Sequence, residues 1–151
     1  MALELYMLGL VVHDMAHPLA FYRRLGVAVP AGSDHVTHVQ VQMGSGLTFF
    51  LDANPTRWDP AFPVARTQAD PRVADGAGGY AVVLEFYLHS RAAVDAKYVE
   101  LTAYGYHSLR PRYVAPIKMY LAMIADPGGT AILLSGELGD ASTPITDVAA
   151  R

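Results

Sequence analysis

The sequence predicts an α+β fold built from two βαβββ modules. Three observations predict it: a strand–helix pattern that occurs twice, a tight hairpin signal after each helix, and a long proline- and glycine-rich stretch between the halves. A connection of that length is often functional, as a lid or a crossover. The expected boundaries are 1–52 for the first module, 53–79 for an inter-module linker or lid, 80–138 for the second module and 139–151 for a loose C-terminal tail.

The repeated unit lies at 9–26 and again at 85–105. Each copy has an apolar strand, a histidine followed by a helix-capping residue, a helical stretch and a closing glycine, where a left-handed backbone is favoured. The corresponding residues are His13, Asp14 and Gly26 in the first copy and His89, Ser90 and Gly105 in the second.

Each helix is followed by strand material and a tight hairpin. The first half has "HVTHVQVQM", "GSG" and "LTFFLD", and the second has "KMYLAMIA", "DPGG" and "TAILLS". Glycine, aspartate and proline supply the turn geometry. A short extra strand around 27–30 and another around 106–113 would complete the two βαβββ modules.

Composition and charge narrow the class of protein. Hydrophobic residues make up 52% of the chain and charged residues 17%, which indicates a globular protein. The net charge is −3 without a long basic run, so nucleic-acid binding is not expected. The absence of cysteine excludes disulfides, thiolate metal sites and a cysteine nucleophile. The start, "MALELYMLGLVV", carries Glu4 and no basic segment, so we expect a strand of a soluble, cytoplasmic protein and no membrane span.

The stretch "HDMAH" at 13–17 has the spacing of a zinc-protease helix of the HExxH type. Pro18 follows His17 directly, and a residue before proline is disfavoured in the α region. His17 therefore belongs to the start of a helix, whereas His13 ends a strand. Because the two histidines do not share a helix face, we prefer solvent-facing histidines at a capped turn.

Two motifs, taken together, resemble the vicinal oxygen chelate superfamily, which includes glyoxalase I, extradiol dioxygenases and the fosfomycin- and bleomycin-resistance proteins. One is similar to that superfamily's D-x6-FY-x2-LG helix and the other to its D-P-D/G-G turn. The matching residues are Asp14, Phe21, Tyr22, Leu25 and Gly26, and Asp126, Pro127, Gly128 and Gly129. The resemblance covers roughly 3–136 and implies that the modules form a cupped mixed sheet, often across a homodimer with exchanged modules.

The resemblance also implies where a metal would bind, namely to a His or Gln on the first strand of a module and a Glu on its last strand. The corresponding residues here are Met7, Phe50, Val83 and Leu133. None of these side chains can bind a hard divalent cation. Within the superfamily this resembles the metal-free bleomycin-resistance type, so we expect no cofactor, while a divalent metal on other ligands stays open.

Side-chain alternation along the strands predicts which residues face the cup. In 80–89 the even positions are all apolar and should pack on a helix, so the odd positions face the cup. In 36–42 the face that carries histidine and glutamines is assigned to the cup, together with alternate residues of the hairpin partner. Trp58, in the linker, could stack on a planar ligand. The candidate ligand-binding residues are His38, Gln40, Gln42, Phe50, Trp58, Glu85, Tyr87, Lys118 and Tyr120.

Glu85 is the candidate catalytic residue because it is a lone acid in an otherwise apolar strand. A buried carboxylate must be paired or protonated. We therefore expect Glu85 either to pair with Lys118 or to be an acid or base with a raised pKa. A structural ion pair and a functional group both remain open.

Three functions are compatible with these residues. The first is a metal-free binding protein for a small, partly aromatic molecule at a dimer interface. The second is a lyase, isomerase or dioxygenase of the same superfamily that uses other ligands, such as His38, Glu85 and Asp52, or Glu85 as a base. The third is a partner-binding or regulatory domain whose cup is filled by side chains.

Overall fold

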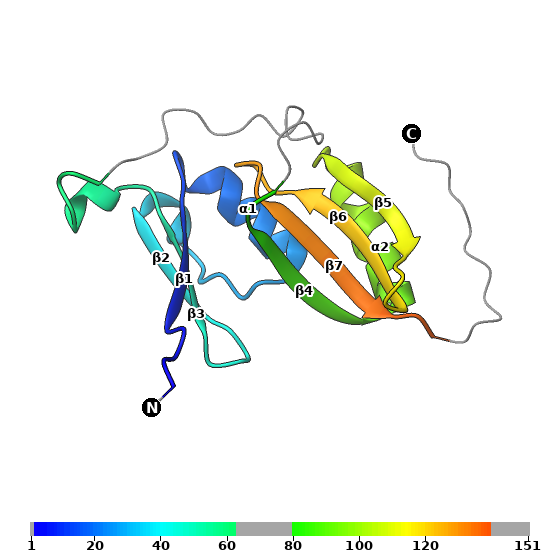
Figure 1. The fold of residues 1–151 in the computed structure, drawn as a ribbon. Helices are drawn as coiled ribbons and strands as arrows, with labels where there is room; N and C mark the ends of the chain where they lie inside the picture. Colours follow the sequence, from blue (N-terminus) through cyan, green and yellow to red (C-terminus); the bar gives the residue numbers. More distant parts are fainter. Residues whose placement is uncertain (1, 63–79, 140–151) are drawn as a thin grey trace. The chain divides into compact units, whose positions relative to one another are not determined.

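The structure is a computed structural model that describes residues 2–62 and 80–139. The elements in chain order are β1 (Met7–Val11), α1 (Ala16–Leu25), the 3-10 helix η1 (Ser33–His35), β2 (His38–Gln42), β3 (Thr48–Asp52), the 3-10 helix η2 (Pro55–Arg57), β4 (Val83–Ser90), α2 (Arg91–Ala103), β5 (Ser108–Val114), β6 (Met119–Ala125) and β7 (Ala131–Glu137). Figure 1 shows these elements. They confirm the predicted α+β class, with two mixed sheets and one α-helix for each sheet.

The chain divides into two compact units, Met1–Gln68 and Ala69–Arg151. Most of the predicted linker or lid, from residue 63 to 79, lies outside the described residues, as does the predicted tail from residue 140 onward. The four boundaries drawn from the sequence therefore stay predictions. None of the helices in the described part of the chain is long and apolar enough to cross a membrane.

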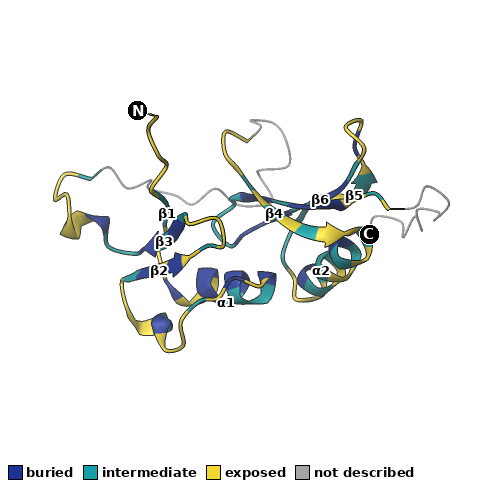
Figure 2. Cartoon of the chain, turned by 90° about the horizontal axis from the view of Figure 1, so that it is seen from below, coloured by how far each residue is buried: buried dark blue, intermediate teal, exposed yellow. Residues whose placement is uncertain are grey.

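The first unit contains a three-stranded sheet in the order β1-β3-β2. β1 is parallel to β3, and β2 is antiparallel to β3. One face packs on α1, where the rings of Tyr22 and Phe49 meet edge to face with centroids 5.1 Å apart. Val39 and Leu51 are buried on the same face. Figure 2 shows α1 beside β2 and β3.

The extra strand predicted around 27–30 is wrong, so the described part of the first module is βαββ. The amide of Val29 donates to the carbonyl of Val27 at 2.8 Å, which closes a tight local turn instead of a strand ladder. Pro30 has no N–H to give to a sheet, and its carbonyl accepts from Arg23 at 3.3 Å. Gly32 then takes a left-handed backbone with φ 75° before η1 begins.

The second unit contains a four-stranded sheet in the order β4-β7-β6-β5. β4 is parallel to β7, and the other neighbours are antiparallel. The strand predicted at 106–113 is confirmed as β5. Helix α2 packs on one face of this sheet, where Val94, Leu101 and Ile132 are fully buried.

Three of the four helix ends follow the sequence signals, whereas the N-cap residue of α1 is Met15 and not the predicted Asp14. The hydroxyl of Ser90 accepts from the amide of Ala93 at 3.1 Å, and the carboxylate of Asp14 accepts from the amide of His17 at 3.0 Å. The closing glycines, Gly26 and Gly105, have φ 115° and 95°. α1 begins at Ala16, after His13, so the two histidines of "HDMAH" do not share a helix face, as predicted.

The turn in the D-P-G-G motif is held by its aspartate. One carboxylate oxygen of Asp126 accepts from the amides of Gly128 at 2.9 Å and Thr130 at 2.8 Å. Gly129 has φ 89°, a conformation that glycine adopts without strain. This turn joins β6 to β7 and sets their antiparallel register.

Candidate functional site

The first sheet has a face opposite α1 that we call the His38 face. Cross-strand register places three residues from each strand on it: Met7, Gly9 and Val11 of β1, His38, Gln40 and Gln42 of β2, and Thr48, Phe50 and Asp52 of β3. Alternation predicted this grouping for His38, Gln40, Gln42 and Phe50, and the structure brings all four together.

Asp52, at one end of the His38 face, is the centre of its hydrogen-bond network. Its side chain is only 3% exposed. Its Oδ2 accepts from Nδ1 of His38 at 2.8 Å and from Nε1 of Trp58 at 2.9 Å, while its Oδ1 accepts from the backbone amide of Asn54 at 2.6 Å. Three donors thus satisfy a carboxylate that would otherwise be costly to bury.

The protonation of Asp52 follows from these contacts. Burial acts to raise the pKa of Asp52, but the hydrogen bonds from Trp58, His38 and the Asn54 amide outweigh burial, and the pKa lies below its usual value. The carboxylate is therefore ionised near neutral pH and can only accept hydrogen bonds.

The ionised Asp52 determines which atom His38 presents. Because Asp52 can only accept, Nδ1 of His38 donates to it, and Nε2 is the ring atom that faces Gln40. Nε2 of the Gln40 side chain lies 3.1 Å from Nε2 of His38 and donates to it. The His38 side chain is 28% exposed and Gln40 is exposed, so this end of the hydrogen-bond chain is accessible.

Aromatic side chains flank the imidazole. The Phe50 ring lies 5.3 Å from the His38 ring at an interplanar angle of 30°. Trp58, at the end of η2, is 54% exposed and meets Phe62 edge to face at 4.8 Å. The role of Trp58 as a ligand lid stays a prediction. Its ring N–H is fixed by Asp52, the carboxylate that also orients His38.

The Phe50 ring occupies space that only a glycine on β1 leaves free. A Cβ built on Gly9 would lie 1.9 Å from Cζ of Phe50. Gly9→Ala should therefore displace the ring and destabilise the protein by about 1–3 kcal/mol, the usual cost of overpacking. Urea unfolding measures the loss of stability, and the NMR shifts of the His38 ring protons report the displaced Phe50.

The matched control for this variant is Gly44→Ala, because a Cβ at Gly44 would meet nothing within 4 Å. Equal stability of the two variants, with unchanged His38 ring shifts, would contradict the expected clash. A stability loss in Gly9→Ala alone would agree with it.

Glu85 and Tyr87 lie on β4, on the face of the second sheet opposite α2, as predicted. The hydroxyl of Tyr87 donates to a carboxylate oxygen of Glu137 at 2.6 Å, and this bond raises the pKa of Tyr87. The ring of Tyr87 lies 4.5 Å from that of His89. Glu85 is exposed, so the expectation of a buried acid that must be paired or protonated is wrong.

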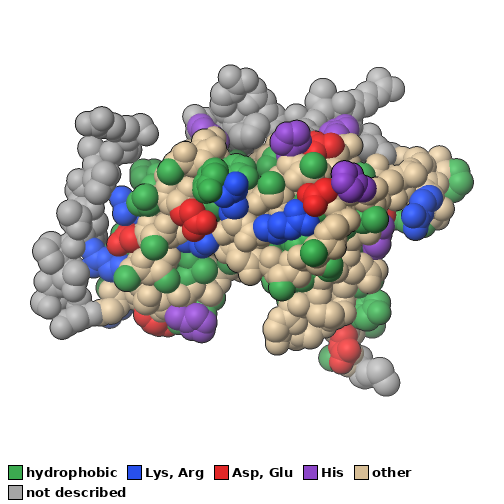
Figure 3. All heavy atoms as spheres, turned by 180° about the vertical axis from the view of Figure 1, so that it is seen from behind, with side chains coloured by type: hydrophobic (Ala, Val, Ile, Leu, Met, Phe, Trp, Pro, Cys, Tyr) green, Lys and Arg blue, Asp and Glu red, His purple; other side chains and the backbone are tan. Residues whose placement is uncertain are grey.

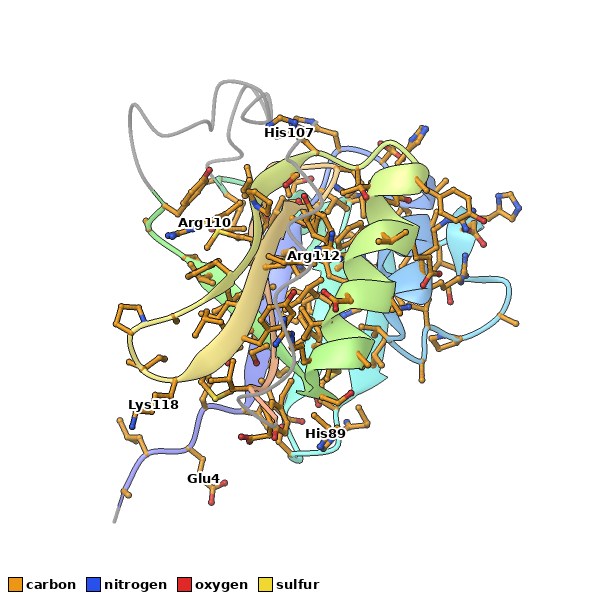
Figure 4. The ribbon with its side chains drawn as sticks, turned by 90° about the vertical axis from the view of Figure 1, so that its right-hand side faces the viewer. Glu4, His89, His107, Arg110, Arg112 and Lys118 are labelled. Atoms are coloured by element: carbon orange, nitrogen blue, oxygen red, sulfur yellow. The ribbon has the colours of Figure 1, made fainter. Side chains whose placement is uncertain are left out.

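The assignment of Tyr120 to the cup is wrong. Tyr120 is 2% exposed and points toward α2, where its hydroxyl donates to Asp95 at 2.7 Å. The Arg91 guanidinium lies 4.8 Å from the ring centre. Arg112 reaches from β5 to the same Asp95 oxygen at 3.1 Å (Figure 4). Tyr120 therefore belongs to the packing between α2 and its sheet.

The pairing of Lys118 with Glu85 is also wrong. Lys118 lies in the turn before β6, with φ 62°, and projects from that turn (Figure 4). Its amide donates to the carbonyl of Ala115. Glu85 is on β4, which is separated from β6 by β7. The sequence does not show this, because strand order and register decide which side chains meet, and they place Met123 of β6 on the level of Glu85.

The residues of this chain do not fit the metal site that the resemblance implies. The four positions carry apolar side chains, Met7, Phe50, Val83 and Leu133, without a donor suited to a hard divalent cation. Both carboxylate oxygens of Asp52 already accept from the protein. Among residues 2–62 and 80–139, no cluster of three His, Cys, Asp or Glu side chains could hold a metal ion.

Charged side chains of both signs are intermixed on the side of the molecule drawn in Figure 3. Ion pairs within one unit include Arg23 with Asp34 at 2.8 Å and Lys97 with Glu100 at 2.8 Å.

Comparison with known proteins supports the fold. No family model and no curated protein matches the sequence. A glyoxalase-related enzyme from Fulvimarina pelagi matches with a TM-score of 0.69 and 18% identity, over 97% of this chain and 99% of that one. A glyoxalase/bleomycin resistance protein/dioxygenase from Nocardioides matches with a TM-score of 0.66 and 21% identity, over 96% and 91%.

A lactoylglutathione lyase from Agrobacterium tumefaciens is similar as well, with a TM-score of 0.59 and 20% identity over 88% of this chain and 92% of that one. The chain therefore has the fold of the glyoxalase/bleomycin resistance protein/dioxygenase structures. The resemblance to the vicinal oxygen chelate superfamily, predicted from the helix and turn motifs, is confirmed at the level of the fold.

Proposed function

We propose that this protein binds a small, partly aromatic organic molecule on the His38 face, without a metal. The observation that carries the proposal is the hydrogen-bond chain from Trp58 through Asp52 to His38, which ends beside the Phe50 ring. A few oriented polar groups next to an aromatic surface are typical of small-molecule sites.

The buried carboxylate supports a functional role over a structural one. A buried ionic group is weak evidence for stability, because well-packed apolar residues stabilise a sheet at least as well. Asp52 instead holds one imidazole in a single orientation and tautomer, while the imidazole edge and the neighbouring Gln40 remain accessible. This arrangement favours recognition of a ligand by His38.

The test is a screen of aromatic fragments by saturation-transfer NMR and thermal shift on the full chain. We expect several fragments to bind the wild type and to raise its melting temperature by mass action. His38→Gln and Gln40→Ala should weaken the best fragment about fivefold or more, the effect of one lost hydrogen bond. His35→Gln, an exposed histidine of η1 in the same unit, is the matched control. Equal binding by all three variants would overturn the proposal.

The proposed assembly is a homodimer. Support comes from apolar side chains beside two edge strands: Leu5 and Tyr6, just before β1, are 72% and 76% exposed, and Val83 of β4 is 43% exposed. Exposed apolar edges favour pairing with another chain. Sedimentation equilibrium should give twice the chain mass, and Tyr6→Lys should lower it. Tyr104→Lys, on the C-terminal side of α2, is the control, and a monomeric wild type would contradict the proposal.

A second candidate function is catalysis, because His38 and Asp52 converge as an oriented base. The similar fold of a lactoylglutathione lyase, which is an enzyme, also supports this candidate. Turnover of lyase, isomerase or dioxygenase substrates that disappears in His38→Gln, but not in Glu85→Gln, would favour this candidate. The cytoplasmic location stays a prediction from the sequence.

A further inference from the structure

We propose that the ligand is a flat molecule with a ring-borne, weakly acidic hydroxyl group, and that this hydroxyl sits between His38 and Gln40. This inference rests on the proposed function and specifies the chemical class of its ligand. The hydroxyl would donate to Nε2 of His38, accept from the side-chain amide of Gln40, and place its ring against Phe50.

The first step of the argument concerns what His38 offers. Nδ1 of His38 donates to Asp52, and Nε2 faces the amide nitrogen of Gln40, which can only donate, so Nε2 acts as an acceptor. The carboxylate bonded to Nδ1 also makes Nε2 a better acceptor, as carboxylates do when they bond to histidines that bind metals. A ligand must therefore bring a donor to this atom.

The second step concerns Gln40. Its amide now donates to Nε2 of His38 over 3.1 Å and must move for a ligand to take that place. Gln40 is exposed on an edge strand, so it can rotate away at little cost. Once displaced, the amide lies beside the incoming ligand atom and can donate to it. One ligand atom that both donates and accepts satisfies both side chains.

The third step of the argument decides which chemical group of the ligand can bond to both His38 and Gln40. A hydroxyl both donates and accepts, a carboxylate has no proton to donate, and an ammonium has no lone pair to accept. A carboxylate would also approach the negative charge of Asp52, and the nine residues of the His38 face include no Lys or Arg. Arg57 of η2 is directed to the hydroxyl of Thr37, at 3.4 Å. A hydroxyl is the group that fits.

The fourth step concerns the shape of the ligand. The centroids of the Phe50 and His38 rings are 5.3 Å apart, so a ring that stacks on Phe50 lies next to the imidazole. The absence of a side chain at Gly9 lets the Phe50 ring lie against β1. A hydroxyl carried directly on a planar ring would reach Nε2 of His38 while the ring stacks on Phe50.

The experiment uses four matched probes on the full chain: 2-naphthol, 2-methoxynaphthalene, 2-naphthoate and 2-naphthylmethylamine, titrated by NMR at neutral pH. We expect 2-naphthol to bind about tenfold more tightly than its methyl ether, since the ether cannot donate to His38. In His38→Phe this preference should fall to about twofold or less, whereas Gln40→Ala should weaken both probes and keep the preference, because the oxygen of either probe accepts from the Gln40 amide. His35→Gln should keep the wild-type preference.

Asp52→Asn tests whether Asp52 sets the tautomer of His38, which a purely structural role of Asp52 would not do. When the asparagine amide nitrogen takes the place of Oδ2, it can donate to Nδ1 of His38, and the half-exposed Trp58 indole bonds to water instead. The ring proton then moves to Nε2, which becomes a donor. The preference for 2-naphthol over the methyl ether should then shrink or reverse, and the ¹⁵N shifts of the His38 ring should report the new tautomer.

Three results would overturn the inference: equal binding of 2-naphthol and its ether, tighter binding of the carboxylate or the amine, or no binding of any probe. If 2-naphthol and its ether bind the wild type equally, and both lose binding in Phe50→Leu, the hydroxyl assignment fails and the proposed aromatic site stands. The proposed function itself is decided by the fragment screen, so the two failures are distinguishable.

Discussion

Asp52→Ala should lower the free energy of unfolding by about 2–3 kcal/mol and abolish binding at the His38 face. The substitution leaves three donors without their acceptor: Nδ1 of His38, Nε1 of Trp58 and the amide of Asn54. An unsatisfied buried donor costs about 1–3 kcal/mol, and the half-exposed Trp58 recovers part of this by bonding to water. Urea unfolding at pH 7 measures the loss.

The control is Asp34→Ala, because Asp34 accepts from Arg23 at 2.8 Å in a more exposed pair. Its effect should be much smaller than that of Asp52→Ala, since exposed ion pairs contribute little. If the two variants lose the same stability, Asp52 is not the centre that the geometry indicates.

The loss of stability in Asp52→Ala should also become smaller at low pH. The pKa of Asp52 is lower in the folded than in the unfolded chain, where an aspartate titrates near pH 3.9. The carboxylate therefore contributes its stability above about pH 4, and this contribution disappears as the pH falls through the folded pKa. Unfolding at pH 7, 5 and 3 should show the difference between wild type and variant shrinking only at the lowest pH. A constant difference would contradict this.

Gly136→Val should destabilise the protein by about 3 kcal/mol, the upper part of the range for overpacking. A Cβ on Gly136 would lie 2.6 Å from the carbonyl oxygen of Ser90 and 3.0 Å from Cγ2 of Val94. Ser90 is the N-cap of α2, so the obstacle is backbone at the junction of β4 and α2, and it cannot rotate away. Thermal and urea unfolding both measure the effect.

Gly44→Val is the matched control, because a Cβ at Gly44 has open space around it. It should unfold close to the wild type. If Gly136→Val does the same, β7 does not approach the start of α2 as closely as the structure indicates.

Local signals in the sequence predicted much of the fold because their physical causes are local. Ser90 caps a helix by bonding three residues ahead, and Gly26 ends one because it tolerates a left-handed backbone. Alternation placed His38 and Gln40 on one face, since successive strand side chains point to opposite sides of a sheet. Two of the wrong predictions also have local causes: Pro30 prevents a strand, and Lys118 is in a turn.

By itself, the sequence determined the class of fold, the N-cap of α2, the closing glycines of both helices and the residues that share the His38 face. Only the tertiary structure decided that Asp52 joins His38 to Trp58 by hydrogen bonds, because these partners come from 14 residues before it and 6 residues after it. The β2–β3 register sets His38 directly opposite Asp52, and η2 returns Trp58 to the same oxygen. The tertiary structure likewise decided that Glu85 is exposed and Tyr120 buried, because burial depends on which elements pack against each strand face, and a strand's own residues do not encode that.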